Sequence, residues 1–151
     1  MKSASWRSQT ATLISVLVLA LVACTDDGGS SEASEETGDD LETLEIVGDY
    51  VDDFMTEHSI TESNWAFSGS IFAIAEFDND AMYVIAQNGP DNMYNPDLWS
   101  RFDWAWDGEQ LYYCQSVYDG PTVEDARAGG ADASDLAMGC GGFAWSMLTP
   151  Q

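Results

Sequence analysis

The stretch SRFDWAWDGEQLYYCQSVY, residues 100–118, contains two strand-like runs around a short turn. Two runs rich in aromatic and β-branched residues flank Asp107 and Gly108, and an Asp-Gly pair between such runs predicts a tight β-hairpin. Side chains alternate between the two sides of a strand. Alternation assigns Phe102, Trp104 and Trp106 to the core side and Arg101, Asp103 and Ala105 to the opposite side.

Strand signals extend over most of the remaining chain. They occupy residues 45–55, 68–77, 81–88 and 139–148, in short runs bounded by turn-forming residues. The run 68–77 is almost continuously apolar, which predicts a strand covered on both faces or packed tightly at its centre. Between it and the next run, residues 78–80 (DND) predict a hairpin turn, because Asp and Asn tolerate left-handed backbone geometry.

One short helix is predicted near the C-terminus. Thr122 can cap its first turn, and the acidic residues 124–125 suit the positive end of the helix dipole. The glycines at 129–130 end the helix. Residues 132–136 are expected to add a further helical turn.

The amino terminus has the features of an export signal. Two basic residues precede the uncharged run 11–23, ATLISVLVLALVA. This run would rise only about 20 Å as a helix, short of the roughly 30 Å hydrocarbon core of a bilayer. We therefore expect residues 1–23 to be a cleaved signal peptide and not a permanent transmembrane helix.

Residues 21–24, LVAC, resemble the lipobox of bacterial lipoproteins. This resemblance implies that Cys24 receives a diacylglyceryl group and becomes the first residue of the mature chain. Two or three acyl chains hold a protein on a membrane far more firmly than one. An aspartate directly after the lipidated cysteine retains some lipoproteins at the inner membrane; Thr25 stands there instead, which favours the outer membrane within the cell envelope.

Residues 24–43 contain almost no large apolar side chain and are rich in acid, glycine and serine. Such a segment cannot bury enough surface to offset its ordering entropy, so we expect a disordered acidic tether. Residues 44–151 then form a single domain, long enough for one modest core.

The charge of the mature chain excludes several partners. The mature chain contains 27 acidic residues and only two basic ones, Arg101 and Arg127, so its net charge is about −25. Nucleic acid binding needs clustered Lys and Arg, and anionic lipid headgroups would repel such a surface. The expected partner is therefore a membrane reached through the N-terminal lipid, and charge repulsion favours a monomer.

Three cysteines leave one unpaired in an exported chain. If Cys24 carries lipid, Cys114 and Cys140 remain as a pair, and an oxidising compartment would keep them as a disulfide. The bond would contribute about 3.5 kcal/mol in the chain-entropy model. It is expected to fix the last strand against the hairpin at 100–118.

The predicted fold is therefore mainly β, either a small antiparallel meander or a lipocalin-like barrel, with one short helix and one disulfide. The similarity to lipocalin-like barrels is one of architecture only. Residues 98–122, together with 83–88 (YVIAQN) and 139–145 (GCGGFAW), also resemble a pattern found in uncharacterised secreted lipoproteins of environmental bacteria. That resemblance implies a disulfide-bonded domain on a lipid tether and carries no catalytic residues.

Few residues point to catalysis. His58 is the sole histidine, and a hydrolase would need it beside a nucleophile such as Ser59 or Ser68. A histidine hydrogen-bonded to a nearby acid is the simpler interpretation. Paired carboxylates such as Asp52 and Asp53 could serve a glycosidase, but pairs are inevitable in so acidic a chain. We expect no catalysis and no cofactor.

Calcium is a weaker alternative. Residues 78–80 and 91–97 offer carboxylate and amide oxygens, which Ca²⁺ prefers, but neither segment completes an EF-hand loop. A hairpin turn and a solvated loop explain both segments without metal. No metal site is predicted.

Aromatic residues are the remaining candidates for a binding site. Five tryptophans remain in the mature chain, and most of them are expected to fill the core. Trp99 and Tyr94, beside the proline-rich loop, are the side chains expected to stay exposed and bind a ligand. We expect a lipid-anchored envelope protein with a binding or structural display role. The alternatives are a barrel for a small apolar or glycan ligand and a hydrolase.

Overall fold

The hairpin predicted at 100–118 forms the longest strand pair of the protein. Strand β6 (Trp99–Asp107) runs antiparallel to β7 (Gln110–Gly120), and the loop between them is Gly108 and Glu109. Gly108 has a φ of 62° at the first loop position, where a two-residue turn of type II′ requires glycine.

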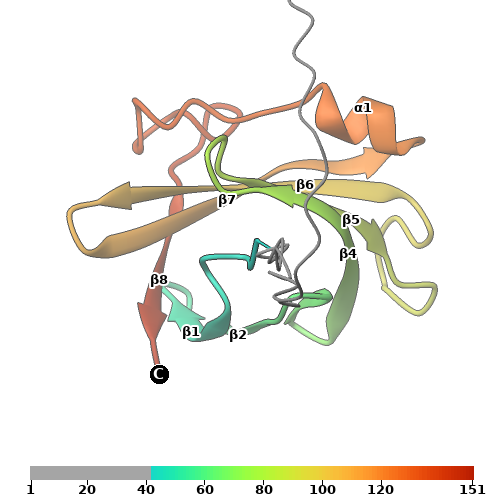
Figure 1. The fold of residues 1–151 in the computed structure, drawn as a ribbon, viewed down its shortest axis with the longest axis horizontal. Helices are drawn as coiled ribbons and strands as arrows, with labels where there is room; N and C mark the ends of the chain where they lie inside the picture. Colours follow the sequence, from blue (N-terminus) through green and yellow to red (C-terminus); the bar gives the residue numbers. More distant parts are fainter. Residues whose placement is uncertain (1–41) are drawn as a thin grey trace, which may run out of the picture. The chain divides into compact units, whose positions relative to one another are not determined.

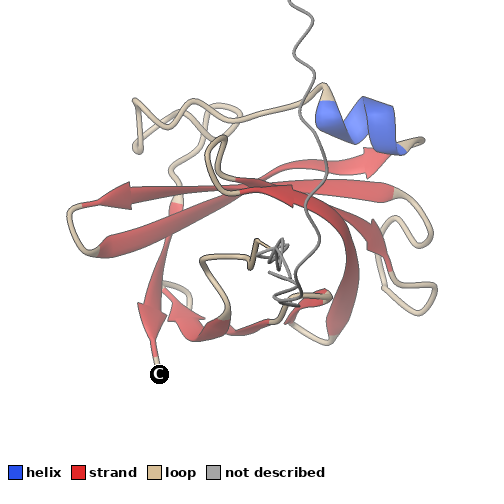
Figure 2. Cartoon of the chain, viewed as in Figure 1, coloured by secondary structure: helices blue, strands red, loops and turns tan. Residues whose placement is uncertain are grey.

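All eight strands join into one closed antiparallel barrel in a computed structural model that describes residues 42–151 (Figure 1). The strands follow chain order around the barrel, and β8 closes it by pairing with both β7 and β1. Figure 2 shows the strands curving around one interior with a single helix outside. The other elements are β1 (Gly48–Asp52), β2 (Glu57–Ile60), β3 (Asn64–Phe67), β4 (Ser70–Asp78), β5 (Tyr83–Asn88), α1 (Val123–Arg127) and β8 (Ser146–Pro150).

The mainly β fold, the short helix and the disulfide are thus confirmed, and the meander is closed into a barrel. Two strands, β2 and β3, were absent from the prediction because each has only four residues. The predicted signal peptide (1–23), the lipidation site Cys24 and the tether up to residue 41 lie outside the described residues.

Strand β4 does not have two covered faces, so that alternative for residues 68–77 is wrong. Phe72 is buried inside the barrel, whereas the neighbouring Ile71 is 54% exposed. The outward side chains of Ala73 and Ala75 are exposed as well. The apolar run therefore supplies only one wall of the core, as in a strand with one solvated face.

The turn between β4 and β5 lies where it was predicted, but its left-handed residue is Met82, with a φ of 54°. Asp78 accepts a hydrogen bond from the backbone N–H of Ala81 at 2.7 Å. Asn79 instead uses its side chain to hold the start of the domain, donating to Thr43 and Glu42. Glu42 and Thr43, assigned to the tether from sequence, therefore contact the barrel.

The N-terminal segment 42–47 closes one end of the barrel. Leu44 and Ile46 are buried in the core, and the backbone N–H of Leu44 donates to Glu62 in the turn between β2 and β3. Glu45 accepts hydrogen bonds from the indoles of Trp104 (2.7 Å) and Trp106 (3.2 Å). This arrangement explains why Trp106, predicted to face the core, is 46% exposed: it lies at the rim of the closed end.

The core fills the barrel below its open end with large side chains. Phe102 and Trp104 face inward as alternation predicts, and Trp65 and Leu148 join them with almost no exposed surface. The rings of Trp65 and Phe102 stack with centroids 4.6 Å apart. Aromatic packing of this kind contributes beyond the area that it buries.

A second, smaller core lies on the outside of β6 and β7. Trp145, from the segment that follows α1, packs there against Ala105 and Cys114, and all three side chains are buried. In Figure 1 this segment and α1 lie above β6 and β7. The outward face of the hairpin is thus covered. The side chains that pack around this cluster are Tyr112, Ala131, Leu136 and Cys140.

The covering segment is irregular, which corrects two predictions. Residues 132–136 form turns and no helix. The last strand begins only at Ser146, so the disulfide between Cys114 and Cys140 ties this loop to β7 and does not fix the terminal strand. A Cβ at Gly139 would overlap backbone carbonyls of the loop, which shows how tightly the loop folds on itself.

Helix α1 begins as predicted, since Thr122 accepts a hydrogen bond from the backbone N–H of Asp125. Its last residue, Arg127, forms two hydrogen bonds with Glu76 on β4, at 2.8 and 2.6 Å. Arg101 donates to the carbonyl of Arg127 and to the carboxylate of Asp103, both within 2.9 Å. Both arginines thus fasten the helix to the outside of the barrel.

We predict that replacing both Cys114 and Cys140 by serine lowers the free energy of unfolding by about 3.5 kcal/mol, because the closed loop no longer restricts the unfolded chain. Urea denaturation of oxidised wild type and the double variant measures this difference. The barrel hydrogen bonds do not involve the bridge, so the far-ultraviolet circular dichroism should stay that of a β protein. Equal stability of the two proteins would contradict the structural role of the disulfide.

Candidate functional site

A pocket of about 460 Å³ occupies the end of the barrel opposite the N-terminal segment. It lies where the turn between β3 and β4, the loop 89–98 and the end of β7 meet, and volumes of this size hold small molecules in other proteins. No lining side chain carries a charge. The apolar lining residues are Phe67, Phe72, Met93, Tyr94 and Tyr118, and the polar ones are Ser68, Ser70, Asn88, Asn95 and Gln115.

The floor of the pocket is aromatic and solid. Phe67 and Phe72 stack with centroids 5.1 Å apart, and Phe72 meets the edge of Phe102 at 5.0 Å. Beneath them lies the filled core of the barrel. A ligand can therefore enter only the mouth of the barrel and not its full length.

The β3–β4 turn shapes one side of the mouth. Ser68 and Gly69 both have positive φ values, 51° and 78°, and connect Phe67 directly to Ser70. This is the backbone geometry of a type I′ turn, which matches the twist of a two-stranded hairpin. The turn holds Phe67 at the rim, where its ring forms part of the floor.

Two buried asparagines hold the loop 89–98 in place. The side chain of Asn92 bonds Ile71 as the backbone of a neighbouring strand would. It accepts a hydrogen bond from the N–H of Ile71 and donates one to the carbonyl of Ile71, each at 2.9 Å. Asn88 donates to the carbonyls of Asn95 (2.7 Å) and Tyr118 (3.1 Å). The loop is therefore fixed at both flanks, and its tip needs little ordering when a ligand binds.

Of the two predicted ligand-binding residues, only Tyr94 lines the pocket. Its side chain is 76% exposed at the tip of the clamped loop. Trp99 is half-buried on β6, where it pairs with Gly120 and Gln87, and it is not among the lining residues. Sequence reasoning missed Phe67, Phe72 and Tyr118, although the Ser-Gly turn after Phe67 was a usable signal for a hairpin at the mouth.

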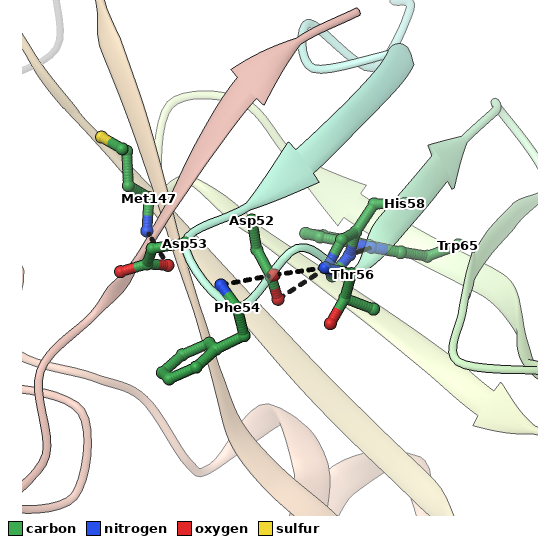
Figure 3. Close-up of polar contacts among 7 residues, drawn as sticks. All are labelled: Asp52, Asp53, Phe54, Thr56, His58, Trp65 and Met147. Atoms are coloured by element: carbon green, nitrogen blue, oxygen red, sulfur yellow. Dashed lines mark hydrogen bonds and ion pairs between the residues drawn. The ribbon is translucent and has the colours of Figure 1, made fainter.

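A chain of hydrogen bonds links Asp52, His58 and Trp65 on three successive strands (Figure 3). His58 is 2% exposed, and its ring stacks on Phe67 with centroids 4.7 Å apart. His58 Nε2 lies 3.3 Å from Asp52 Oδ2, and the indole of Trp65 donates to His58 Nδ1 at 3.1 Å. The prediction of a histidine hydrogen-bonded to an acid is confirmed.

These contacts define the tautomer of His58. An indole N–H can only donate, so His58 Nδ1 accepts and carries no proton. The remaining ring proton is on Nε2 and is donated to Asp52. Burial lowers the pKa of His58 below its usual value, and the nearby carboxylate of Asp52 offsets this effect only in part. The ring is therefore neutral.

Asp52 stays ionised in this environment. Burial by itself raises the pKa of Asp52, but hydrogen bonds from Thr56, His58 and Phe54 lower it below its usual range overall. The two backbone donors lie 2.7 Å (Thr56) and 2.9 Å (Phe54) from Oδ1. Burial, reinforced by the charge of Asp52, raises the pKa of the neighbouring Tyr113. A carboxylate with a neutral histidine partner thus lies inside the barrel.

The geometry of His58 differs from that of a hydrolase. Both ring nitrogens are bonded, to Asp52 and Trp65, and neither partner is Ser59 or Ser68. The adjacent acids Asp52 and Asp53 also separate: Figure 3 shows the side chain of Asp53 directed to the backbone of Met147, whose N–H donates to it at 3.1 Å.

The acidic segments considered for calcium have protein partners. Asp78 and Asn79 hold the turn and the N-terminal segment, and Asn92 is bonded to Ile71. Within residues 42–151, no group of three His, Cys, Asp or Glu residues is arranged to hold a metal ion. In the same range, no helix combines the length and apolarity needed to cross a membrane.

A wider depression of about 860 Å³ extends over β2 and β3 and is open to solvent. Its lining mixes acidic and polar side chains such as Asp49, Glu57 and Ser59 with the apolar Met55 and Ile71. A ligand there would keep much of its surface in water. The smaller pocket at the mouth is therefore the better candidate site.

Comparisons of the chain with protein-family models, with curated proteins and with solved structures returned no match. The chemistry of the mouth pocket is thus the guide to function.

We predict that acid destabilises the fold through His58. Below the usual histidine pKa of 6.5 the unfolded chain binds a proton that the folded protein, with its lowered pKa, does not bind. The free energy of unfolding therefore falls as the pH decreases, by up to about 1.4 kcal/mol per pH unit, until the folded pKa is reached.

The matched control is His58→Gln, whose amide can still accept from Trp65 and donate to Asp52 but does not titrate. Urea denaturation of both proteins between about pH 7.5 and pH 5 isolates the contribution of the histidine from that of the many carboxylates. Wild type should lose stability on acidification relative to the variant. Parallel curves, or a relative gain for wild type, would show that His58 is not held neutral.

Proposed function

We propose that this protein is a lipid-anchored binding protein of the bacterial cell envelope, whose barrel holds a small, largely apolar molecule in its mouth. The observation that carries the proposal is the pocket of about 460 Å³ above a solid aromatic floor. Ligand sites are typically concave, mostly apolar and formed before the ligand arrives. The clamped loop 89–98 gives the pocket this last property.

The exposed rim favours ligand binding over passive display. Met93, Tyr94 and Tyr118 present large apolar surfaces to solvent around the pocket, with exposed fractions of 81%, 76% and 56%. A bound molecule would remove part of this surface from water, at roughly 25 cal/mol for each Å² buried.

Two polar side chains of the lining, Asn88 and Gln115, are not available to bind a glycan. Asn88 uses its amide within the protein, donating to two carbonyls and accepting from Ser100 at 2.6 Å. The amide of Gln115 donates to the same Ser100 hydroxyl at 3.0 Å. Sugar recognition needs several free donors and acceptors, and these two side chains are already engaged.

The anchor in this proposal is the thiol of Cys24, which the lipobox resemblance identifies. Eighteen residue steps separate Cys24 from Glu42, and a chain of that length spans at most about 60 Å. The chain enters the barrel at the closed end, through residues 42–47. A tether attached there leaves the pocket at the opposite end accessible to the surrounding medium.

We predict that 1-naphthalenemethanol, a neutral aromatic probe small enough for the pocket, binds the protein and that Tyr94→Ala weakens this binding about tenfold, because the variant removes one aromatic wall. Fluorescence titration measures both affinities. Phe143→Ala is the matched control: Phe143 is also 76% exposed but does not line the pocket. An equal loss in the two variants, or none in Tyr94→Ala, would refute this site.

We predict that Cys24→Ser releases the protein from the membrane fraction of a bacterium that processes lipoproteins, because the thiol that accepts the acyl chains is gone. Fractionation and labelling with radioactive palmitate test this expectation. Wild type should carry label and sediment with membranes. An unlabelled wild-type protein, or a labelled serine variant, would rule out lipidation at this residue.

A further inference from the structure

A buried negative charge lies one side chain away from the floor of the mouth pocket, because His58 contacts both Asp52 and the floor residue Phe67. The Asp52 carboxylate receives two backbone hydrogen bonds and one from His58, and its side chain is 4% exposed. His58 accepts from the indole of Trp65, so this histidine is neutral and does not balance the charge of Asp52. The His58 ring then stacks on Phe67, which lines the pocket.

The two arginines of the described domain are engaged elsewhere. Arg101 pairs with Asp103 at 2.8 Å, and Arg127 pairs with Glu76 at 2.6 Å. Neither arginine is among the residues that line the pocket, and no lysine occurs in residues 42–151. An anionic ligand in the mouth would therefore lose its hydration without gaining a cationic partner.

The rim adds further negative charge. Asp91 and Asp97 belong to the loop that carries Met93 and Tyr94, and Asp119 directly follows Tyr118. These acids are close in sequence to the lining residues but are not part of the lining itself. They attract cations to the mouth over a distance of about one Debye length, roughly 8 Å at physiological salt.

The lining itself suits a cation with an apolar body. Phe67, Phe72, Tyr94 and Tyr118 provide aromatic rings within one small volume. The face of such a ring attracts an ammonium group, most strongly where water is excluded. Aromatic rings therefore accept both the apolar body and the positive charge of the same ligand.

We infer that the mouth pocket selects a cationic amphiphile, a small amine with an aromatic or branched apolar body, over neutral and anionic molecules of the same shape. This inference rests on the proposed function and adds the sign of the charge on the ligand. The Asp52 carboxylate, which no cation balances and which is joined to the floor residue Phe67 through His58, carries the selectivity together with the aromatic lining.

The test compares three probes that share one naphthalene skeleton: 1-naphthylmethylammonium, 1-naphthalenemethanol and 1-naphthoate. Their affinities for the wild-type protein are measured by fluorescence titration at physiological salt and neutral pH. The ammonium should bind about fivefold tighter than the alcohol, and the carboxylate about fivefold weaker, as expected for one charge acting over several Å at intermediate dielectric. Tyr94→Ala should weaken all three, and Phe143→Ala none.

The outcomes separate this inference from the proposed function. If the alcohol or the carboxylate binds as tightly as the ammonium, the charge preference is wrong and the pocket remains a binding site. If the ammonium is preferred but Tyr94→Ala leaves its affinity unchanged, the preference comes from the acidic surface at large, and the inference is again overturned. If no probe binds, both the charge preference and the proposed function are wrong.

Discussion

The structure depends on one buried chain of hydrogen bonds, from Trp65 through His58 to Asp52. It ties β3, β2 and β1 together, and Asp52 pairs in register with Leu148 of β8, the strand that closes the barrel. The same carboxylate accepts from Phe54 and Thr56 and so fixes the turn between β1 and β2. All members of the chain are satisfied, which is the condition under which a buried polar network specifies one arrangement.

The two ends of the barrel have different roles: one end stabilises the fold, and the other forms the proposed binding pocket. At one end the segment 42–47 inserts Leu44 and Ile46 into the core, and Glu45 joins the indoles of Trp104 and Trp106. At the other end the core stops at a layer of phenylalanines, and a loop held by buried amides presents exposed aromatic residues. A small barrel that is packed solid below can leave its mouth free for a ligand without losing its core.

Sequence reasoning succeeded where local signals are strong and failed where tertiary contacts decide. Alternation placed Phe102 and Trp104 correctly, and Thr122 caps the helix as expected. Alternation placed Ala105 on the outer face of the hairpin, but Ala105 is buried. The loop that contains Cys140, which is disulfide-bonded to Cys114, covers that face. The strands of four residues were too short for a periodic pattern, and the left-handed Met82 has no propensity signal. The proline-rich loop pointed to Tyr94, but its partners in the pocket come from distant strands.

The central claim of this account is that a neutral His58, stacked on the floor residue Phe67, faces an ionised Asp52. Nitrogen-15 NMR of the histidine side chain tests it directly, since His58 is the sole histidine of the chain and its ring signals are unambiguous. At neutral pH the account predicts one neutral ring, with the proton on Nε2 and a bare Nδ1 that accepts from Trp65. A doubly protonated imidazolium, or a ring protonated on Nδ1, would contradict it.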